Sequence, residues 1–303
     1  MRSKFVKAWS VGIYIGESPF NIIEYSLNPI ISANDIKEIP AYFIADPFLV
    51  NHHGTMYIFF ELLNTKTGRG EIGVSRSSDY KKWQFLGTVL NENYHISYPM
   101  VFEWDENYYM IPETMKDNSI RLYKAIDFPY DWMYVGNLLE GKPYRDSTIF
   151  YHDNIWWLYT TYDDKNLYLY YSDDFLKNEW TKHPASPLVN GRYARPGGRI
   201  IRYNNRIIRF SQDLFPVYGS RIVAFEVDLL SPEQYNEKMI EPIPFLGPTG
   251  KGWNKNRVHH VDCHELESGE WLVVADGFSN NINYSVNIAI HRILQKFRSI
   301  LHF

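Results

Sequence analysis

Paired apolar strands recur along this chain, each pair opened by polar residues and joined by a short polar turn. In the first copy a strand starts at Asp46-Pro47, turns at His53-Gly54 and returns as an aromatic-rich strand. Apolar segments bounded by such turns are typical of β-hairpins. The five copies are Ala45–Glu61, Ser97–Glu113, Arg145–Thr161, Ala194–Gln212 and His259–Asp276.

The spacing of these copies indicates a repeat architecture. If Asp46, Tyr98, Asp146, Arg195 and Asp262 are taken as equivalent points, the steps are mostly about 50 residues, the blade period of a β-propeller. The last step is longer because we interpret Leu229–Asn256, rich in Pro and Gly, as an insertion. We predict an all-β, five-bladed β-propeller that fills residues 1–303 as one domain. We expect the blades at about 40–92, 93–140, 141–190, 191–230 and 257–290, with a closing strand at 8–16 as the outer strand of the last blade.

The tail departs from this pattern and predicts a short C-terminal helix. In Asn287–Phe303 apolar residues recur at helical spacing, with Arg292, Lys296 and Arg298 between them. Two interpretations stay open. The helix packs under the propeller, or it lies on a membrane surface as a basic amphipathic helix.

Composition narrows the class of protein. Hydrophobic residues make up 45% and charged residues 22%, which are ordinary globular values. The net charge of −4 gives no general attraction for nucleic acid, so we expect none among the partners. A lone cysteine, Cys263, fits a reducing compartment, and the N-terminal residues show no secretory signal. We expect a cytoplasmic protein, and under the second interpretation of the tail helix it makes peripheral contact at the inner membrane face.

Polar residues open the inner strands, and these positions converge on one mouth of a propeller's axis. Because buried charges are costly unless they pair or bind something, this set is a candidate site. Taken alone, Asp46-Pro47 is also an ordinary strand-start device, but it recurs in register with Asp146. The candidates are Asp46, Tyr98, Arg145, Asp146, Arg195, His259, His260 and Asp262.

A second set of candidates comes from the ends of the returning strands. Glu113 closes the second aromatic strand as Glu61 closes the first and Gln212 the fourth, where Asp213 follows. These residues either face the channel or are exposed strand ends. Gly197-Gly198 allows close backbone approach or forms a phosphate cradle. The sequence contains no P-loop, dinucleotide-binding, zinc-protease or nucleophile-elbow motif, so those enzyme classes have no support.

Several stretches carry a resemblance that covers nearly the whole chain. In order they are ADPFLV, FFE, HISYPMVFEWDENYYMIPE, SIRLYKA, WWLY, ARPGGR, SQD, VYG and HHVD. With these the chain resembles the propeller domain of the glucosamine inositolphosphorylceramide transferase family, in its stand-alone bacterial form. That resemblance implies surface polysaccharide or glycolipid biosynthesis.

The architecture is also distantly similar to five-bladed glycosidases of the arabinanase, levansucrase and invertase group. This similarity implies that Asp46 is the base or nucleophile and that Asp146, preceded by Arg145, stabilises the transition state. The general acid of that group has no counterpart, because the fourth copy opens with Arg195-Pro196-Gly197-Gly198. Glu113 is the best substitute.

The missing acid favours transfer over hydrolysis. A glycosidase must protonate an alkoxide leaving group, whereas a phosphate leaves without protonation and needs positive charge. We expect that charge from Arg145, Arg195, Arg199, His259 and His260.

We therefore expect a glycosyltransferase that uses a nucleotide- or phosphate-linked sugar donor and a glycan or glycolipid acceptor. Asp46, Asp146 and Glu113 are its catalytic candidates. Its substrate-binding candidates are Tyr98, Arg145, Arg195, Arg199, Gln212, Asp213, His259, His260 and Asp262. A furanosidase-like hydrolase and a non-catalytic glycan-binding module remain as alternatives. No cofactor or catalytic metal is assigned, and a structural cation on the axis near His260 stays an open alternative.

Overall fold

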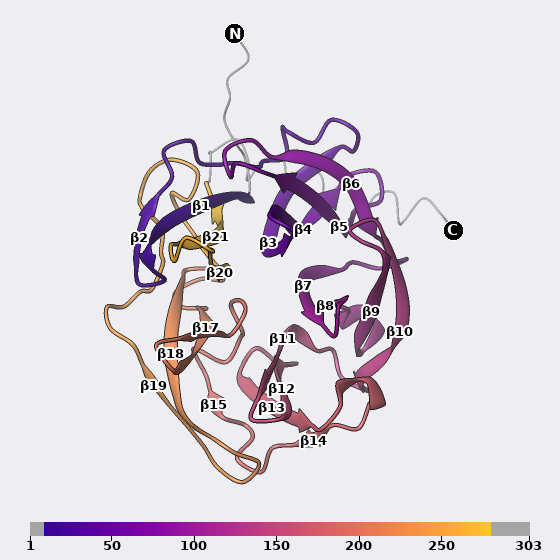
Figure 1. Ribbon diagram of the computed structural model, residues 1–303, viewed down its shortest axis with the longest axis vertical. Helices are drawn as coiled ribbons and strands as arrows, with labels where there is room; N and C mark the ends of the chain where they lie inside the picture. The colour runs from indigo at the N-terminus through magenta and orange to yellow at the C-terminus, as the bar shows by residue number, and fades with distance from the viewer. Residues whose placement is uncertain (1–8, 280–303) are drawn as a thin grey trace.

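Five antiparallel sheets surround a common axis in the computed structural model, which describes residues 9–279 (Figure 1). The predicted all-β, five-bladed propeller is therefore confirmed. Helical structure in this range is limited to two single 3₁₀ turns, η1 (Met115–Asp117) and η2 (Phe175–Lys177). The predicted tail helix lies outside the described residues. Within 9–279 no helix has the length and apolar character needed to cross a bilayer.

Each of the first two blades is a meander that runs from the axis outward. Blade one consists of β3 (Ala41–His52), β4 (Thr55–Asn64), β5 (Arg69–Ser77) and β6 (Gln84–Leu90). Blade two consists of β7 (Ser97–Trp104), β8 (Asn107–Glu113), β9 (Ser119–Asp127) and β10 (Asp131–Glu140).

The third and fourth blades follow the same order with shorter edge strands. Blade three consists of β11 (Arg145–His152), β12 (Ile155–Thr161), β13 (Asn166–Ser172) and β14 (Thr181–Lys182), and β15 (Val189–Asn190) also pairs with β13. Blade four consists of β16 (Ile201–Tyr203), β17 (Arg206–Asp213), β18 (Arg221–Leu230) and β19 (Tyr235–Met239). The outermost strand β19 lies within the stretch interpreted as an insertion, so that interpretation was wrong there.

The fifth blade joins the two ends of the described chain. It consists of β20 (Val261–Glu265), β21 (Trp271–Phe278), β1 (Trp9–Ser18) and β2 (Asn21–Glu24). Strand β1 pairs with β21, and β2 adds outside it. The N-terminal strand thus closes the ring as predicted, but it is the third strand of the blade and β2 is the outer one.

Turn chemistry explains the register of the inner hairpins. The first four inner hairpins close through two residues with positive φ, the backbone that matches strand twist in two-residue turns. Gly, Asn and Asp tolerate this conformation best. The turn residues are His53-Gly54, Asp105-Glu106, Asp153-Asn154 and Asn204-Asn205.

The hydrophobic core is divided among the interfaces between blades. Strand β12 shows why, because Trp156 and Leu158 pack toward blade two while Trp157 and Tyr159 pack toward blade four. Alternate side chains of a strand point to opposite faces, so a strand buried on both faces is apolar at successive positions. The blades are therefore held rigidly, and the starts of their inner strands are fixed around the axis.

Candidate functional site

The inner strands of blades one to three each begin with a bulge that turns one residue toward the axis. Asp46, Tyr98 and Asp146 occupy these positions, with φ of 51°, 47° and 45°. At each of them the pairing with the second strand shifts register. A bulge re-aims a side chain, and a non-glycine residue with positive φ costs about 1–3 kcal/mol. Three residues at one end of the axis therefore have this strained backbone conformation.

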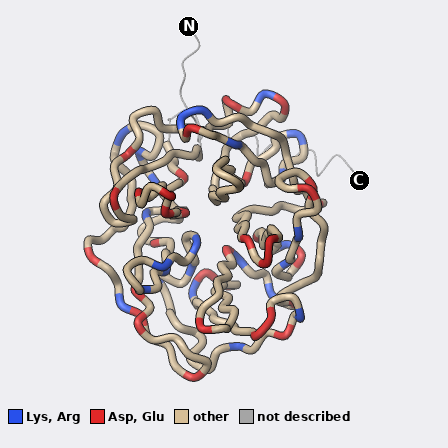
Figure 2. The backbone as a smooth tube through the Cα atoms, in the orientation of Figure 1, with Lys and Arg blue, Asp and Glu red and all other residues tan. Residues whose placement is uncertain are grey.

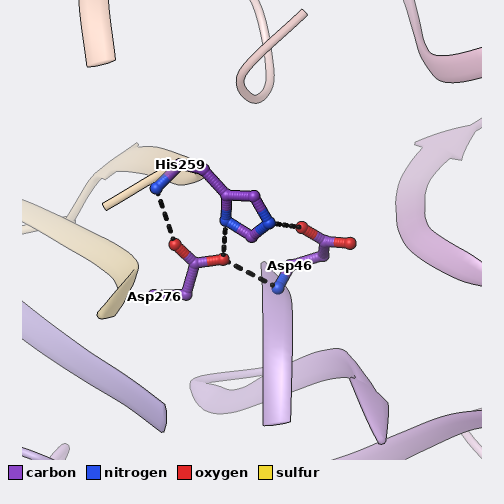
Figure 3. Close-up of side chains that lie close together, drawn as sticks. All are labelled: Asp46, His259 and Asp276. Atoms are coloured by element: carbon purple, nitrogen blue, oxygen red, sulfur yellow. Dashed lines mark hydrogen bonds and ion pairs between the residues drawn. The ribbon is translucent and has the colours of Figure 1, made fainter. Parts of the chain in front are cut away.

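Asp46 is buried and surrounded by hydrogen bonds and charges from three blades. Its Oδ2 accepts a hydrogen bond from the backbone N–H of Tyr98 at 3.2 Å, and its own N–H donates to Asp276 Oδ2 at 3.2 Å. The Nε2 atom of His259 lies 3.7 Å from Asp46 Oδ1 (Figure 3). Burial raises the pKa of Asp46 well above its usual range, His259 opposes the shift, and neighbouring carboxylates such as Glu61 add to it.

His259 lies between two carboxylates, Asp46 and Asp276 (Figure 3). Its Nδ1 is 2.5 Å from Asp276 Oδ2, and its ring stacks on Trp9 with centroids 4.1 Å apart. Burial alone would lower the pKa of His259, but Asp276 and then Asp46 raise it to about 9. His259 is therefore a cation at neutral pH, held beside Asp46.

Asp276 fixes this arrangement. Its Oδ1 accepts the backbone N–H groups of His259 and His260 at 3.0 and 3.1 Å. Sequence reasoning missed Asp276 as a site residue. The sequence did offer a signal, because Asp276 lies near the end of the second strand of its blade, as Glu61, Glu113 and Gln212 do.

Asp146, on the inner strand of blade three, is the centre of a second charged group. Its Oδ2 accepts hydrogen bonds from Arg195 Nε and, at 2.6 Å, from Gln212 Nε2. Burial would raise the pKa of Asp146, but the adjacent Arg195 guanidinium lowers it. Asp146 is therefore an ionised carboxylate.

Glu113 adjoins this group and behaves in the opposite way. Its Oε2 lies 3.6 Å from Arg195 and is buried without a hydrogen-bond partner in the described part of the chain. Burial raises the pKa of Glu113 well above its usual range, Asp146 adds to the shift, and Arg195 opposes it. Two adjacent carboxyl groups thus have pKa values shifted in opposite directions, as those of acid and base pairs are in many active sites.

The arginines at the mouth are paired with carboxylates. Arg145 and Arg195 both contact Asp164, which lies in the loop after β12. Arg145 has a side chain 26% exposed at the rim, and its Nε lies 3.0 Å from Met115 Sδ. Asp164 was not predicted, since it lies outside the repeated strands.

Arg199 and Asp262 lie away from these carboxylates and bind each other. Arg199 Nε donates to Asp262 Oδ1 at 2.8 Å, and its NH2 group donates to the carbonyl oxygens of Leu49 and Val101. The register also corrects the assumed repeat. Asp262 pairs with Val274, two residues before Asp276, which makes it equivalent to Phe48 and not to Asp46.

His260 is buried between aromatic rings. Its ring lies edge-on to those of Phe48 and Tyr98, with centroids 4.5 and 5.1 Å away. Burial lowers the pKa of His260 to about 4, so it is neutral and poorly suited to binding an anion. Tyr98 is fully buried and bonds through its hydroxyl to Thr148 Oγ1 at 2.8 Å, so its ring is part of the core between the blades.

Asp213 anchors the loop between β17 and β18. It accepts hydrogen bonds from Arg192 at 2.5 and 2.6 Å and from Arg221 at 2.7 Å. The loop carries Tyr218, whose ring meets His259 edge-on at 5.2 Å and lies 5.2 Å from Arg195 Cζ. Tyr218 was also missed as a site residue, although it lies in the VYG stretch that carries the resemblance.

Within residues 9–279 one cluster could supply metal ligands, and its contacts do not favour an ion. Asp46, His259 and Asp276 offer atoms within 4.8 Å of one another. Both oxygens of Asp276, however, already accept hydrogen bonds, and His259 Nδ1 faces one of them. The arrangement is a chain of ion pairs. The cation on the axis near His260 stays a prediction.

The wider charge distribution is mixed. In the described chain acidic and basic residues intermingle around the ring in the view of Figure 2. The concentration of carboxylates at the mouth is thus a local feature, which long-range electrostatics do not explain.

Comparison with known proteins gives a consistent match. The family model described as "Glucosamine inositolphosphorylceramide transferase 1, N-terminal" matches residues 4–278. Glucosamine inositolphosphorylceramide transferase 1 of Arabidopsis thaliana is 35% identical over 301 residues, which cover 89% of this chain and 39% of that protein. The protein of that name from Oryza sativa subsp. japonica is 33% identical over 298 residues, which cover 89% and 40%. The chain thus matches well under half the length of these plant relatives.

Solved structures show the same fold at low identity. A glycosyl hydrolase from Bacteroides ovatus has a TM-score of 0.64 and 12% identity, covering 84% of this chain and 92% of that chain. A β-1,2-mannobiose phosphorylase from Listeria innocua has a TM-score of 0.63 and 14% identity, covering 88% and 96%.

Proposed function

Since this chain belongs to the family of the N-terminal part of glucosamine inositolphosphorylceramide transferase 1, we propose that it is a glycosyltransferase. It would transfer a sugar from a nucleotide- or phosphate-linked donor to a glycan or glycolipid acceptor. The name of the plant relatives supports transfer to a lipid-linked acceptor, and we extend that activity to this chain as a proposal. We further propose a cytoplasmic enzyme of surface polysaccharide or glycolipid biosynthesis.

The observation that carries the proposal is that three carboxyl groups held in one place have pKa values shifted in opposite directions. Asp146 has a lowered pKa, whereas Asp46 and Glu113 have raised ones. Asp46 and Asp146 occupy strained bulges, and such strain is concentrated at functional sites. Buried carboxyl groups and strained bulges both cost folding free energy, so stability alone does not explain why they occur together here.

Asp46 is the proposed base. A carboxylate with a raised pKa accepts a proton from an acceptor hydroxyl more readily than an ordinary one does. His259, a cation 3.7 Å away, keeps the ionised form of Asp46 accessible despite burial. Asp276, the third residue of this series of ion pairs, keeps His259 in position beside Asp46.

Asp146 is the proposed stabiliser of the transition state. Glycosyl transfer builds positive charge on the sugar ring, and an ionised carboxylate fixed by Arg195 and Gln212 is placed to oppose it. Glu113, protonated beside it, would bind a sugar hydroxyl or the leaving oxygen. Arg145, Arg195 and His259 would face the donor phosphate, whereas Arg199, Asp262 and neutral His260 have no such role in this proposal.

Glycoside hydrolysis is the second candidate, and Glu113 is the reason. A carboxylic acid with a raised pKa is the group that a glycosidase needs to protonate an alkoxide leaving group. The two candidates therefore differ in the substrate that is consumed.

The test is turnover by the purified chain with a panel of sugar nucleotides and sugar phosphates, an inositol-phosphate glycolipid acceptor, and a parallel panel of furanosides. Mass spectrometry of the products is the readout. We expect transfer, and a loss of about 10³-fold in Asp46→Asn, because a general base contributes about 10²–10⁴-fold. Asp127→Asn, an exposed carboxylate at the end of β9, is the matched control and should keep full activity.

Three outcomes would contradict the proposal. Unchanged transfer in Asp46→Asn removes the base assignment. Release of reducing sugar from a furanoside, abolished in Glu113→Gln, favours the hydrolase. Oligosaccharide binding without turnover, surviving Asp46→Asn, indicates a glycan-binding module.

A further inference from the structure

The loop between β17 and β18, residues 214–220, exposes apolar side chains beside the candidate site. Phe215, Val217 and Tyr218 are 62%, 47% and 42% exposed. Exposed apolar residues gathered on a loop next to a site are a mark of ligand contact, because folding alone gives no reason to display them.

Hydrogen bonds at the base of the loop hold it in one conformation. Asp213 at its base is fully buried and accepts hydrogen bonds from Arg192, Arg221 and the backbone N–H of Phe215. Ser220 closes the loop, with its N–H bonding to Asp213 O at 3.2 Å and its hydroxyl to Val217 O at 2.6 Å. A surface held in one conformation loses little entropy on binding.

Tyr218 connects the loop to the site. Its ring meets His259, the residue that contacts Asp46, and covers the guanidinium of Arg195. Its hydroxyl end lies among the charges. Burial raises the pKa of Tyr218 most, Arg195 opposes the shift, and Asp146, Asp46 and Glu113 add to it. The ring nevertheless remains partly open to solvent.

Gly219 makes this approach of loop and site sterically feasible. Its φ is +71°, and a Cβ there would lie 2.9 Å from the Trp9 ring and 3.2 Å from His259 Cβ. Gly219 O also accepts the N–H of Val258 at 3.1 Å, which ties the loop to the chain just before His259. The loop and the Asp46–His259 chain therefore form one unit.

We propose that loop 214–220 is the platform of the acceptor subsite, with the Tyr218 ring packed against the C–H face of an acceptor sugar and Phe215 and Val217 at its margin. This inference rests on the proposed function. The nearby guanidinium groups of Arg192 and Arg221 are already bound to Asp213, so the loop offers apolar faces and little charge. That chemistry suits an uncharged sugar ring and not a phosphate. The contact with His259 also places the platform on the side of the proposed base.

The first experiment separates acceptor from donor binding. In the transfer assay, Tyr218→Ala should raise the KM for the acceptor about 3- to 10-fold, the range expected for loss of an aromatic contact. Phe215→Ala should raise it about 2-fold. Tyr218→Phe keeps the ring and should preserve the acceptor KM, and the donor KM should stay near the wild-type value in each variant. Tyr130→Ala, which removes a side chain 45% exposed between β9 and β10, is the matched control.

The other possible results distinguish a failure of the platform from a failure of the proposed transferase activity. Turnover with an unchanged acceptor KM in Tyr218→Ala and Phe215→Ala overturns the platform but leaves the transferase intact. A donor KM that rises as much as the acceptor KM also overturns it. If the wild-type chain turns over no donor, calorimetric titration with short manno-, gluco- and galacto-oligosaccharides takes over. Binding lost in Tyr218→Ala keeps the platform while the transferase fails, and no binding by the wild type overturns both.

Discussion

Two groups of arginine, aspartate and histidine lie near the propeller axis, and they differ in how completely they are satisfied. In the deeper group, Asp262 bonds to Arg199 and His264 and to the N–H of Leu49, while Arg199 also bonds to backbone oxygens in blades one and two. Burial would raise the pKa of Asp262, but Arg199 and His264 hold it far below its usual range. This group is a clamp that joins four blades.

At the mouth the same residue types are arranged differently. Three carboxyl groups surround Arg195, and three of the candidate residues, Asp46, Tyr98 and Asp146, have positive φ. Among the described residues, Glu113 Oε2 and Gln212 Oε1 are buried there without hydrogen-bond partners. Buried polar atoms are normally paired, so unpaired ones in a strained setting indicate a site that awaits a ligand. The two groups thus contain the same residue types and differ in how fully their polar atoms are hydrogen-bonded.

The largest expected effect comes from breaking the deeper clamp. Arg199→Met removes the guanidinium that pairs with the buried Asp262 and leaves it only His264 and the N–H of Leu49, which should lower the free energy of unfolding by about 3–5 kcal/mol. Asp46→Asn should change it by less than about 1 kcal/mol or raise it, because an amide escapes the cost of burying a charge at a functional position. Urea unfolding of both variants is the measurement. Equal destabilisation by the two would erase the distinction between the groups.

The charge on His259 predicts how stability at the mouth depends on pH. Its pKa is about 9 in the folded protein against 6.5 for an unperturbed histidine. The stabilisation it gives is therefore complete below about pH 6.5 and lost as the pH rises toward about 9. Between these values the wild type should lose up to about 3 kcal/mol more than His259→Gln, measured by unfolding at a series of pH values. Parallel curves for the two proteins would show that His259 is not held as a cation.

Glu113 gives the smallest effect and the sharpest distinction between the two candidate reactions. With a phosphate-activated donor, Glu113→Gln should slow transfer only about 10-fold, because the leaving group needs no proton. Glu103→Gln, an exposed carboxylate on β7, is the control and should have no effect. Comparing kcat for each variant gives the result. A loss of about 10³-fold or more would identify Glu113 as an essential general acid and favour hydrolysis.

The sequence was sufficient for the fold because the hairpins are local. Two-residue turns such as Asp153-Asn154 and apolar strands such as β12 repeat at a fixed interval, so blade number and strand pairing follow from neighbours in the chain. The convergence of Asp46 and Asp146 was predicted for the same reason. The stretch Leu229–Asn256 was wrongly interpreted as an insertion. Its strand β19 lies at the outer edge of blade four, and its residues are half-exposed or exposed, so no apolar pattern marks it as a strand.

The details of the site depended on contacts between distant segments. Arg195 was expected to be free for a phosphate, but Asp164, from a loop outside the repeat, is paired with it. The alignment of Asp262 with Asp46 was wrong because Asp262 pairs with Val274, the register of Phe48, which lies two residues after Asp46. The VYG stretch marked Tyr218 only through the resemblance, because the place of its side chain depends on Asp213 holding the loop.

The most direct test of the account is a crystal structure of Asp46→Asn with a sugar nucleotide donor and an oligosaccharide acceptor. We predict that the reacting sugar lies at the mouth, within hydrogen-bond distance of position 46 and Glu113, with the acceptor ring on Tyr218 and no ligand atom at Arg199 or Asp262. A sugar bound elsewhere, such as in the cavity lined by Tyr171, Asp174 and Trp180 on the outer side of blade three, would contradict it.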